Sequence, residues 1–77
     1  MSARPYLTRA EFTRLKGRLT RAVNKAKAEP NEVELWRAVE AERDYAFAIF
    51  DEYVWPDDWA RWERAADDAH WTARRLA

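Results

Sequence analysis

The sequence predicts an all-α fold, an up-down-up antiparallel three-helix bundle with helices over about residues 9–28, 32–54 and 57–76. Apolar side chains recur at spacings of three and four in each segment, which is the pattern of a helix that packs on one side. Pro30 and Pro56 stand between the segments, and proline interrupts a helix because it has no backbone N–H. The 77-residue chain contains only one glycine, so little else breaks the helical pattern.

The first helix is predicted to begin after Thr8 and to end before Pro30. Thr8 and Glu11 match a T-x-x-E capping box, in which the threonine side chain accepts a hydrogen bond from a free backbone N–H. Residues 1–7 precede this cap, and we expect them to form a flexible N-terminal tail. The apolar stripe of this helix consists of Phe12, Leu15, Leu19, Ala22, Val23 and Ala26.

The second helix is predicted to begin at about residue 32, because Asn31 followed by Glu34 is a further capping signal. Its apolar arc is wider than the stripe of the first helix. A wide arc is typical of a helix that packs on two sides, so we expect this helix to lie in the centre. The arc consists of Leu35, Trp36, Val39, Ala46, Phe47, Ile49, Phe50, Tyr53 and Val54.

The third helix is predicted to begin at about residue 57, after the break at Trp55 and Pro56. Asp57 and Asp58 then lie in its first turn, where the helix dipole favours negative charge. Both connections are short, so consecutive helices should be antiparallel neighbours. Three helices of about 20 residues, each roughly 30 Å long, make a slender body. We therefore expect that dimerisation could complete the core. The third apolar stripe consists of Trp59, Trp62, Ala66, Ala69, Ala73 and Leu76.

Composition limits the class of protein. The chain has no cysteine, which excludes disulfides and thiolate metal sites. Neither a signal peptide nor an apolar run of roughly 18 residues is present, so we expect no membrane contact and a location in the cytoplasm of a cell or an infected host. The excess of arginine over lysine and the many alanines are typical of GC-rich genomes, such as those of actinobacteria and their phages.

Charge is divided unevenly along a chain of zero net charge. Residues 1–28 hold eight basic residues and one acid, and residues 29–77 hold six basic and thirteen acidic residues. Four basic residues of the first helix recur at spacings of four, three and four, so they stack on one face. These residues are Arg14, Arg18, Arg21 and Lys25. They could follow the phosphates of a nucleic acid, or they could face the acidic helices of the same protein or lie in solvent.

Catalytic chemistry finds little support in the sequence. Glu63, Asp67 and His70 share one flank of the third helix, but a carboxylate-bridged metal site usually needs a second histidine, and none exists. We expect a solvated row of ion pairs with Arg74 instead. No serine or threonine stands beside a base in a way that suggests a nucleophile. We expect no enzyme activity, no cofactor, no metal and no small-molecule substrate.

Arg43 lies within the apolar arc of the second helix. A buried arginine must be paired, because an uncompensated buried charge is costly. We expect a structural ion pair that fixes the register of the helices. Its predicted partner is one of three carboxylates, Glu11, Glu63 or Asp67.

Trp71 lies on the polar face of the third helix, beside Arg74 and Arg75. An arginine could cover the ring by cation–π contact, or the ring could belong to a protein interface, where tryptophan and arginine are enriched. Tyr45 and Trp55 lie near the edge of the apolar arc and could extend that surface. We expect a non-enzymatic protein–protein interaction module, a homodimer or a phage or actinobacterial modulator of a host protein. The alternative is a small nucleic-acid-binding protein.

Overall fold

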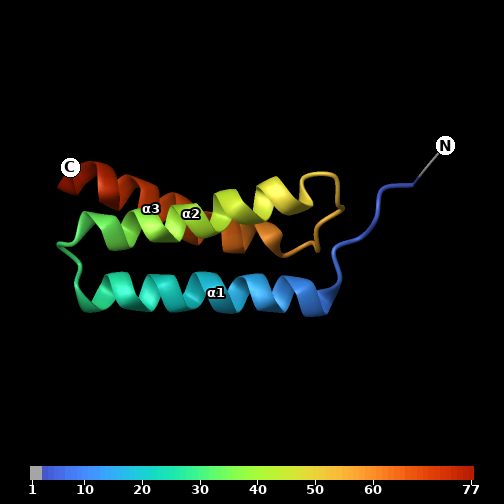
Figure 1. Ribbon diagram of the computed structural model, residues 1–77, viewed down its shortest axis with the longest axis horizontal. Coiled ribbons are helices and arrows are strands. Elements are labelled where there is room, and N and C mark those ends of the chain that lie inside the picture. Colours follow the sequence, from blue (N-terminus) through green and yellow to red (C-terminus); the bar gives the residue numbers. More distant parts are fainter. Residues whose placement is uncertain (1–2) are drawn as a thin grey trace.

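The computed structural model describes residues 3–77 and confirms the all-α three-helix architecture. Helix α1 spans Arg9–Ala28, α2 spans Val33–Phe50 and α3 spans Trp59–Leu76. The three helices alternate in direction along one long axis (Figure 1), and α1 and α3 each pack against α2. The body measures 48 × 20 × 17 Å.

Helix α1 has the predicted bounds, and its cap explains why. The backbone N–H of Glu11 donates to Thr8 Oγ1 at 3.1 Å, and the Thr8 hydroxyl donates to Glu11 Oε1 at 3.0 Å. At the other end, the Glu29 N–H donates to the carbonyl oxygens of Lys25 and Ala26, after which Pro30 prevents continuation.

Helix α2 begins without the cap that the sequence predicts. Glu32 occupies the N-cap position and no side chain caps the helix, so the prediction for Asn31 is wrong. The preceding turn provides a backbone bond instead, from the Glu32 N–H to the Glu29 carbonyl at 3.0 Å. The helix also ends at Phe50, four residues before the predicted end at residue 54.

Helix α3 begins at Trp59, two residues later than predicted. The Trp59 N–H donates to the Pro56 carbonyl at 3.0 Å in a turn that contains both aspartates. Asp58 occupies the N-cap position but makes no side-chain capping bond. Its carboxylate instead accepts hydrogen bonds from Arg9 at 3.1 Å, which ties the turn to the start of α1.

The N-terminal segment pairs with the connection between α2 and α3. The Val54 N–H donates to the Pro5 carbonyl at 2.8 Å, and the Leu7 N–H donates to the Val54 carbonyl at 2.9 Å. Leu7 is only 4% exposed. The prediction of a flexible tail is therefore wrong for residues 4–7. The early end of α2 leaves the Val54 backbone available for this pairing. Met1 and Ser2 lie outside the described residues.

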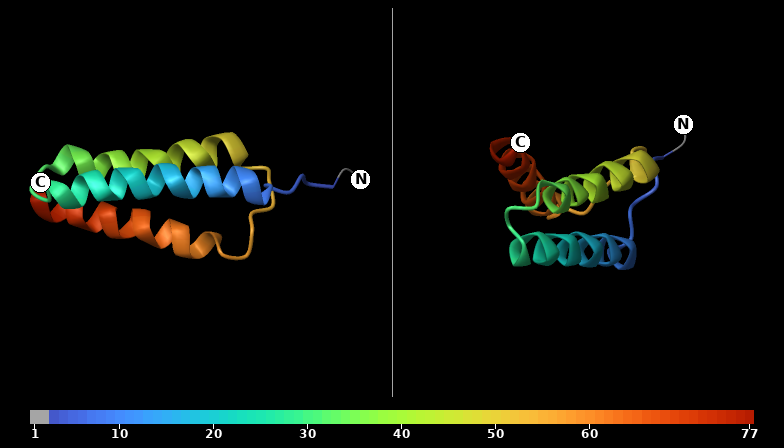
Figure 2. Two further views of the ribbon diagram at one scale, coloured as in Figure 1. Left: turned by 90° about the horizontal axis from the view of Figure 1, so that it is seen from below. Right: turned by 60° about the vertical axis from the view of Figure 1, so that its left-hand side comes forward.

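The core lies on both sides of α2, as predicted from its wide apolar arc. Helices α1 and α3 each pack along α2 and touch one another much less, and the gap between them widens toward the C-terminus of α3 (Figures 1 and 2). One end of the bundle, here called the aromatic end, contains Phe12, Phe47, Phe50, Tyr53, Trp55, Trp59 and Trp62. The other, here called the alanine end, is centred on Ala26, Val39, Ala69 and Ala73.

Candidate binding surfaces

Trp71 is the most exposed tryptophan of the chain. It is 56% exposed, whereas the other four are buried or half-buried. The guanidinium of Arg74 lies 5.5 Å from its ring centroid, and the His70 ring meets it edge-on at 5.3 Å. Arg74 and Arg75 are exposed, and neither forms an ion pair with any acid in residues 3–77. We call Trp71, Arg74 and Arg75 the Trp71 surface.

Tyr45 and Trp55 do not extend the Trp71 surface. Tyr45 is 55% exposed but lies on the side of α2 that faces α1, where the Arg18 guanidinium sits 5.6 Å from its ring centroid. Trp55 is half-buried in the aromatic end, where its ring centroid lies 5.2 Å from that of Trp62. Its indole N–H donates to the Phe50 carbonyl. The prediction that Trp55 lies at an exposed surface missed the turn that directs its ring inward.

Part of the positive charge of α1 is compensated within the protein. Arg18 donates to both carboxylate oxygens of Glu42, at 2.9 and 3.4 Å. This hydrogen-bonded carboxylate raises the pKa of the Arg18 guanidinium. Arg9 and Lys16 both approach Asp58, and the hydrogen bond from Arg9 lowers the pKa of the Asp58 carboxyl. The interpretation that α1 faces acids of its own chain therefore holds for these three cations.

The remaining cations of the predicted stripe lie in solvent. Arg14, Arg21 and Lys25 are exposed and have no acidic partner among residues 3–77. A shallow hollow lies beside the stripe, between α1 and the α2 residue Glu42. Glu42 pairs with Arg18 and not with the other three cations of the stripe. We call Arg14, Arg21 and Lys25 the free basic face.

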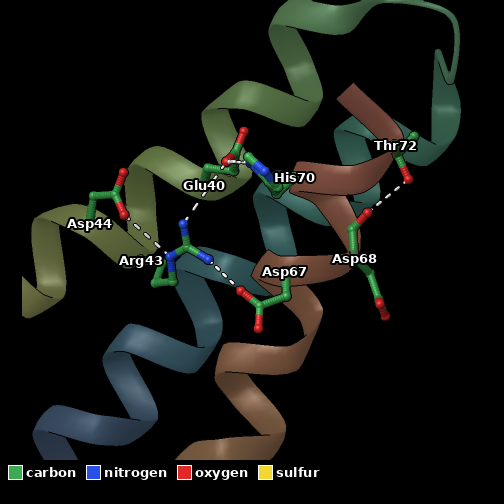
Figure 3. Close-up of polar contacts among 7 residues, drawn as sticks. All are labelled: Glu40, Arg43, Asp44, Asp67, Asp68, His70 and Thr72. Carbon is green, nitrogen blue, oxygen red and sulfur yellow. Dashed lines mark hydrogen bonds and ion pairs between the residues drawn. The ribbon is translucent and has the colours of Figure 1, made fainter. Parts of the chain in front are cut away.

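Arg43 joins α2 to α3 in a network of charged side chains (Figure 3). Its side chain is 17% exposed, and its Nη1 lies 2.6 Å from Asp67 Oδ1, one of the three partners expected from the sequence. Asp44 approaches Arg43 Nε at 3.2 Å, and Glu40 approaches Nη2 at 3.9 Å. Glu40 was not among the expected partners, although its spacing of three from Arg43 indicates that contact is possible. Asp44 is the next residue along α2, and no helical spacing rule predicts its contact with Arg43.

His70 belongs to the same network. Its Nδ1 lies 2.6 Å from Glu40 Oε1 of α2 (Figure 3). The expected solvated row with Arg74 is therefore wrong, because Asp67 and His70 turn toward α2 while Arg74 lies over Trp71. Asp67 and His70 therefore link α3 to α2, whereas Glu63 forms no ion pair within residues 3–77.

No cluster of three or more potential metal ligands occurs within residues 3–77. In the same part of the chain, no helix has the length and apolar character needed to cross a bilayer.

Comparison with protein-family models, curated proteins and solved structures finds no significant match.

Proposed function

We propose that this protein is a non-enzymatic protein-binding module that uses the Trp71 surface. The observation that carries the proposal is a tryptophan 56% exposed beside two arginines without acidic partners in the described chain. Exposing an indole ring to water forgoes the burial that the other tryptophans have. Tryptophan and arginine also dominate the energetic centres of protein interfaces.

The Trp71 surface favours an acidic partner with an apolar pocket. Arg74 packs over the ring and Arg75 follows it in the last turn of α3, where its Nη2 donates to Thr72 Oγ1 at 3.3 Å. An incoming carboxylate could accept bidentate hydrogen bonds from either guanidinium, and the indole could fill an apolar pocket between them. Such a partner would supply acidic groups to Arg74 and Arg75, which have no acidic partner within residues 3–77.

A photo-crosslinking residue at position 71, introduced in cells that naturally produce this protein, tests the proposal. We expect a discrete crosslinked species whose second component mass spectrometry identifies as a different protein. The matched control places the same residue at Arg61, which is exposed on another face of α3. The species should disappear in R74E/R75E, since reversed charges would repel an acidic partner.

The outcomes separate the alternatives. A crosslinked species composed of two copies of this chain would assign the Trp71 surface to a homodimer instead. The same crosslinks from positions 61 and 71, or none from position 71, would contradict the proposal.

A second candidate function rests on the free basic face. Arg14, Arg21 and Lys25 lie on the open side of α1, and the exposed Tyr45 lies across the Arg18–Glu42 pair from them. Phosphates would pair with the three cations, and an unstacked base could stack on the tyrosine ring. These features favour a single strand over a duplex, because duplex bases are not free to stack.

Fluorescence anisotropy with a labelled single-stranded oligonucleotide tests this candidate. Three uncompensated cations predict a slope of log affinity against log salt of about −2. R21E/K25E should abolish binding, whereas R61E/R64E, which changes the net charge equally on α3, should preserve it. Equal losses in the two variants, no binding at low salt, or tighter binding of the duplex would each reject the candidate.

A further inference from the structure

The aromatic end of the bundle contains an open hollow of about 460 Å³. This volume falls within the range of small-ligand pockets, roughly 300–1,000 Å³. Its walls come from the end of α2, the connection to α3 and the first turns of α3. Four aromatic and two acidic side chains line it: Phe47, Tyr53, Trp55, Trp59, Asp51 and Glu63.

The two carboxylates are available to a ligand. Neither Asp51 nor Glu63 forms an ion pair with a cation of the described chain. Asp51 is also the C-cap residue of α2, so the hollow lies at the negative end of that helix dipole. Negative side chains and the helix terminus therefore favour positive charge at the same place.

One cation of this protein already uses the edge of this site. Arg4 lines the hollow, and its guanidinium donates to the main-chain oxygens of Glu52 at 3.0 Å and Asp51 at 3.1 Å. Because these bonds go to carbonyl groups, they leave the side-chain carboxylates of Asp51 and Glu63 free. Arg4 compensates the terminus of α2, and the hollow keeps two acidic side chains against this one basic side chain.

We propose that the hollow binds an organic cation, a methylated ammonium group or a basic side chain of that kind. Aromatic rings attract such cations through the negative charge of their faces, and nearby carboxylates supply the counter-charge. An anion would be repelled by Asp51 and Glu63. A neutral ligand would gain no counter-charge from these carboxylates. The site is separate from the Trp71 surface and from the free basic face.

Two-dimensional NMR of the full chain tests the proposal, with the indole N–H signals of Trp55 and Trp59 as reporters. The probes are choline, its neutral isostere in which carbon replaces the quaternary nitrogen, and a short peptide containing trimethyllysine. We expect saturable shifts with choline and the peptide and none with the isostere. Tighter binding of the peptide would assign the natural ligand to a protein side chain, and tighter binding of choline would assign it to a free small molecule.

D51N/E63Q should weaken choline binding about tenfold or more, because it removes both counter-charges. This variant is expected to fold, since removing an acid from the C-terminus of α2 does not oppose its dipole. E32Q/D68N is the matched control, with the same change of net charge at two exposed acids elsewhere. Equal binding of the isostere, equal losses in the two variants, or no saturable shift of the two indole signals would overturn the proposal.

Discussion

The two ends of this bundle pack their helices together with side chains of very different size. At the aromatic end, Phe12 is fully buried and meets Trp55 and Trp62 edge-on, at centroid distances of 6.0 and 6.4 Å. At the alanine end, Ala69 and Ala73 are equally well buried but add almost no side-chain volume. The first end depends on large rings that fill space, and the second depends on small side chains that let helices approach closely.

Polar contacts follow the same division. Toward the alanine end, the Arg43–Asp67 and His70–Glu40 pairs join α2 to α3, and Arg43 is largely buried. At the aromatic end, the ion pair of Arg9 with Asp58 lies in solvent. Toward the alanine end, partly buried ion pairs link two helices, whereas the exposed pair at the aromatic end contributes little.

The largest effect is expected from truncation at the aromatic end. Phe12→Ala removes a fully buried ring and should cost about 3–5 kcal/mol of unfolding free energy. A domain of this size has only about 3–5 kcal/mol from its core, so the variant should be mostly unfolded at room temperature. Urea denaturation followed by circular dichroism measures this. A cost below about 1 kcal/mol would show that the rings contribute little.

The alanine end should fail in the opposite way, by the addition of volume. Ala69→Leu should cost about 1–3 kcal/mol, because Ala69 is 1% exposed and a larger side chain would push α3 away from α2. The exposed Ala48→Leu is the control and should change stability little. Equal thermal midpoints for the two variants would indicate that the helices at this end are not closely packed.

The ion-pair network should give an intermediate effect. Arg43→Ala should cost about 1–2 kcal/mol, less than a fully buried pair, because Asp67 is half exposed. Arg43→Met restores most of the apolar contact and should recover part of the loss. If the two variants are equally unstable in urea, the charges matter more than the packing of the arginine stem.

The smallest effect is expected from the exposed pair at the aromatic end. Because the pKa of Asp58 is lowered in the folded state, its contribution is present at neutral pH and is lost as pH falls below the ordinary value of 3.8. Asp58→Asn should therefore slightly reduce stability at pH 7 and reduce its loss on acidification. Thermal melts at a series of acidic pH values measure the difference. An unchanged pH profile would show that the Arg9–Asp58 pair contributes nothing.

The sequence predicts what depends on near neighbours. Thr8 and Pro30 define α1 because capping and proline act within one turn, and the wide apolar arc correctly places α2 in the centre. The spacing of Arg43 on α2 also limited its partners to a few carboxylates, among them Asp67.

Contacts between distant segments could not be predicted in this way. The pairing of Pro5 with Val54 and the inward position of Trp55 both accompany the early end of α2, and no local pattern indicates either. The His70–Glu40 contact depends on the relative rotation of two helices. The aromatic hollow also depends on residues that come together only after the chain turns between α2 and α3.

The pairing of Pro5 and Leu7 with Val54 has a consequence for the order of folding. It joins segments almost fifty residues apart, so it forms once α2 has folded back along α1 and brought Val54 to the start of the chain. The amide protons of Leu7 and Val54 therefore report on closure of the α1–α2 hairpin rather than on helix formation. In exchange experiments they should gain protection after the amide protons within α1 and α2.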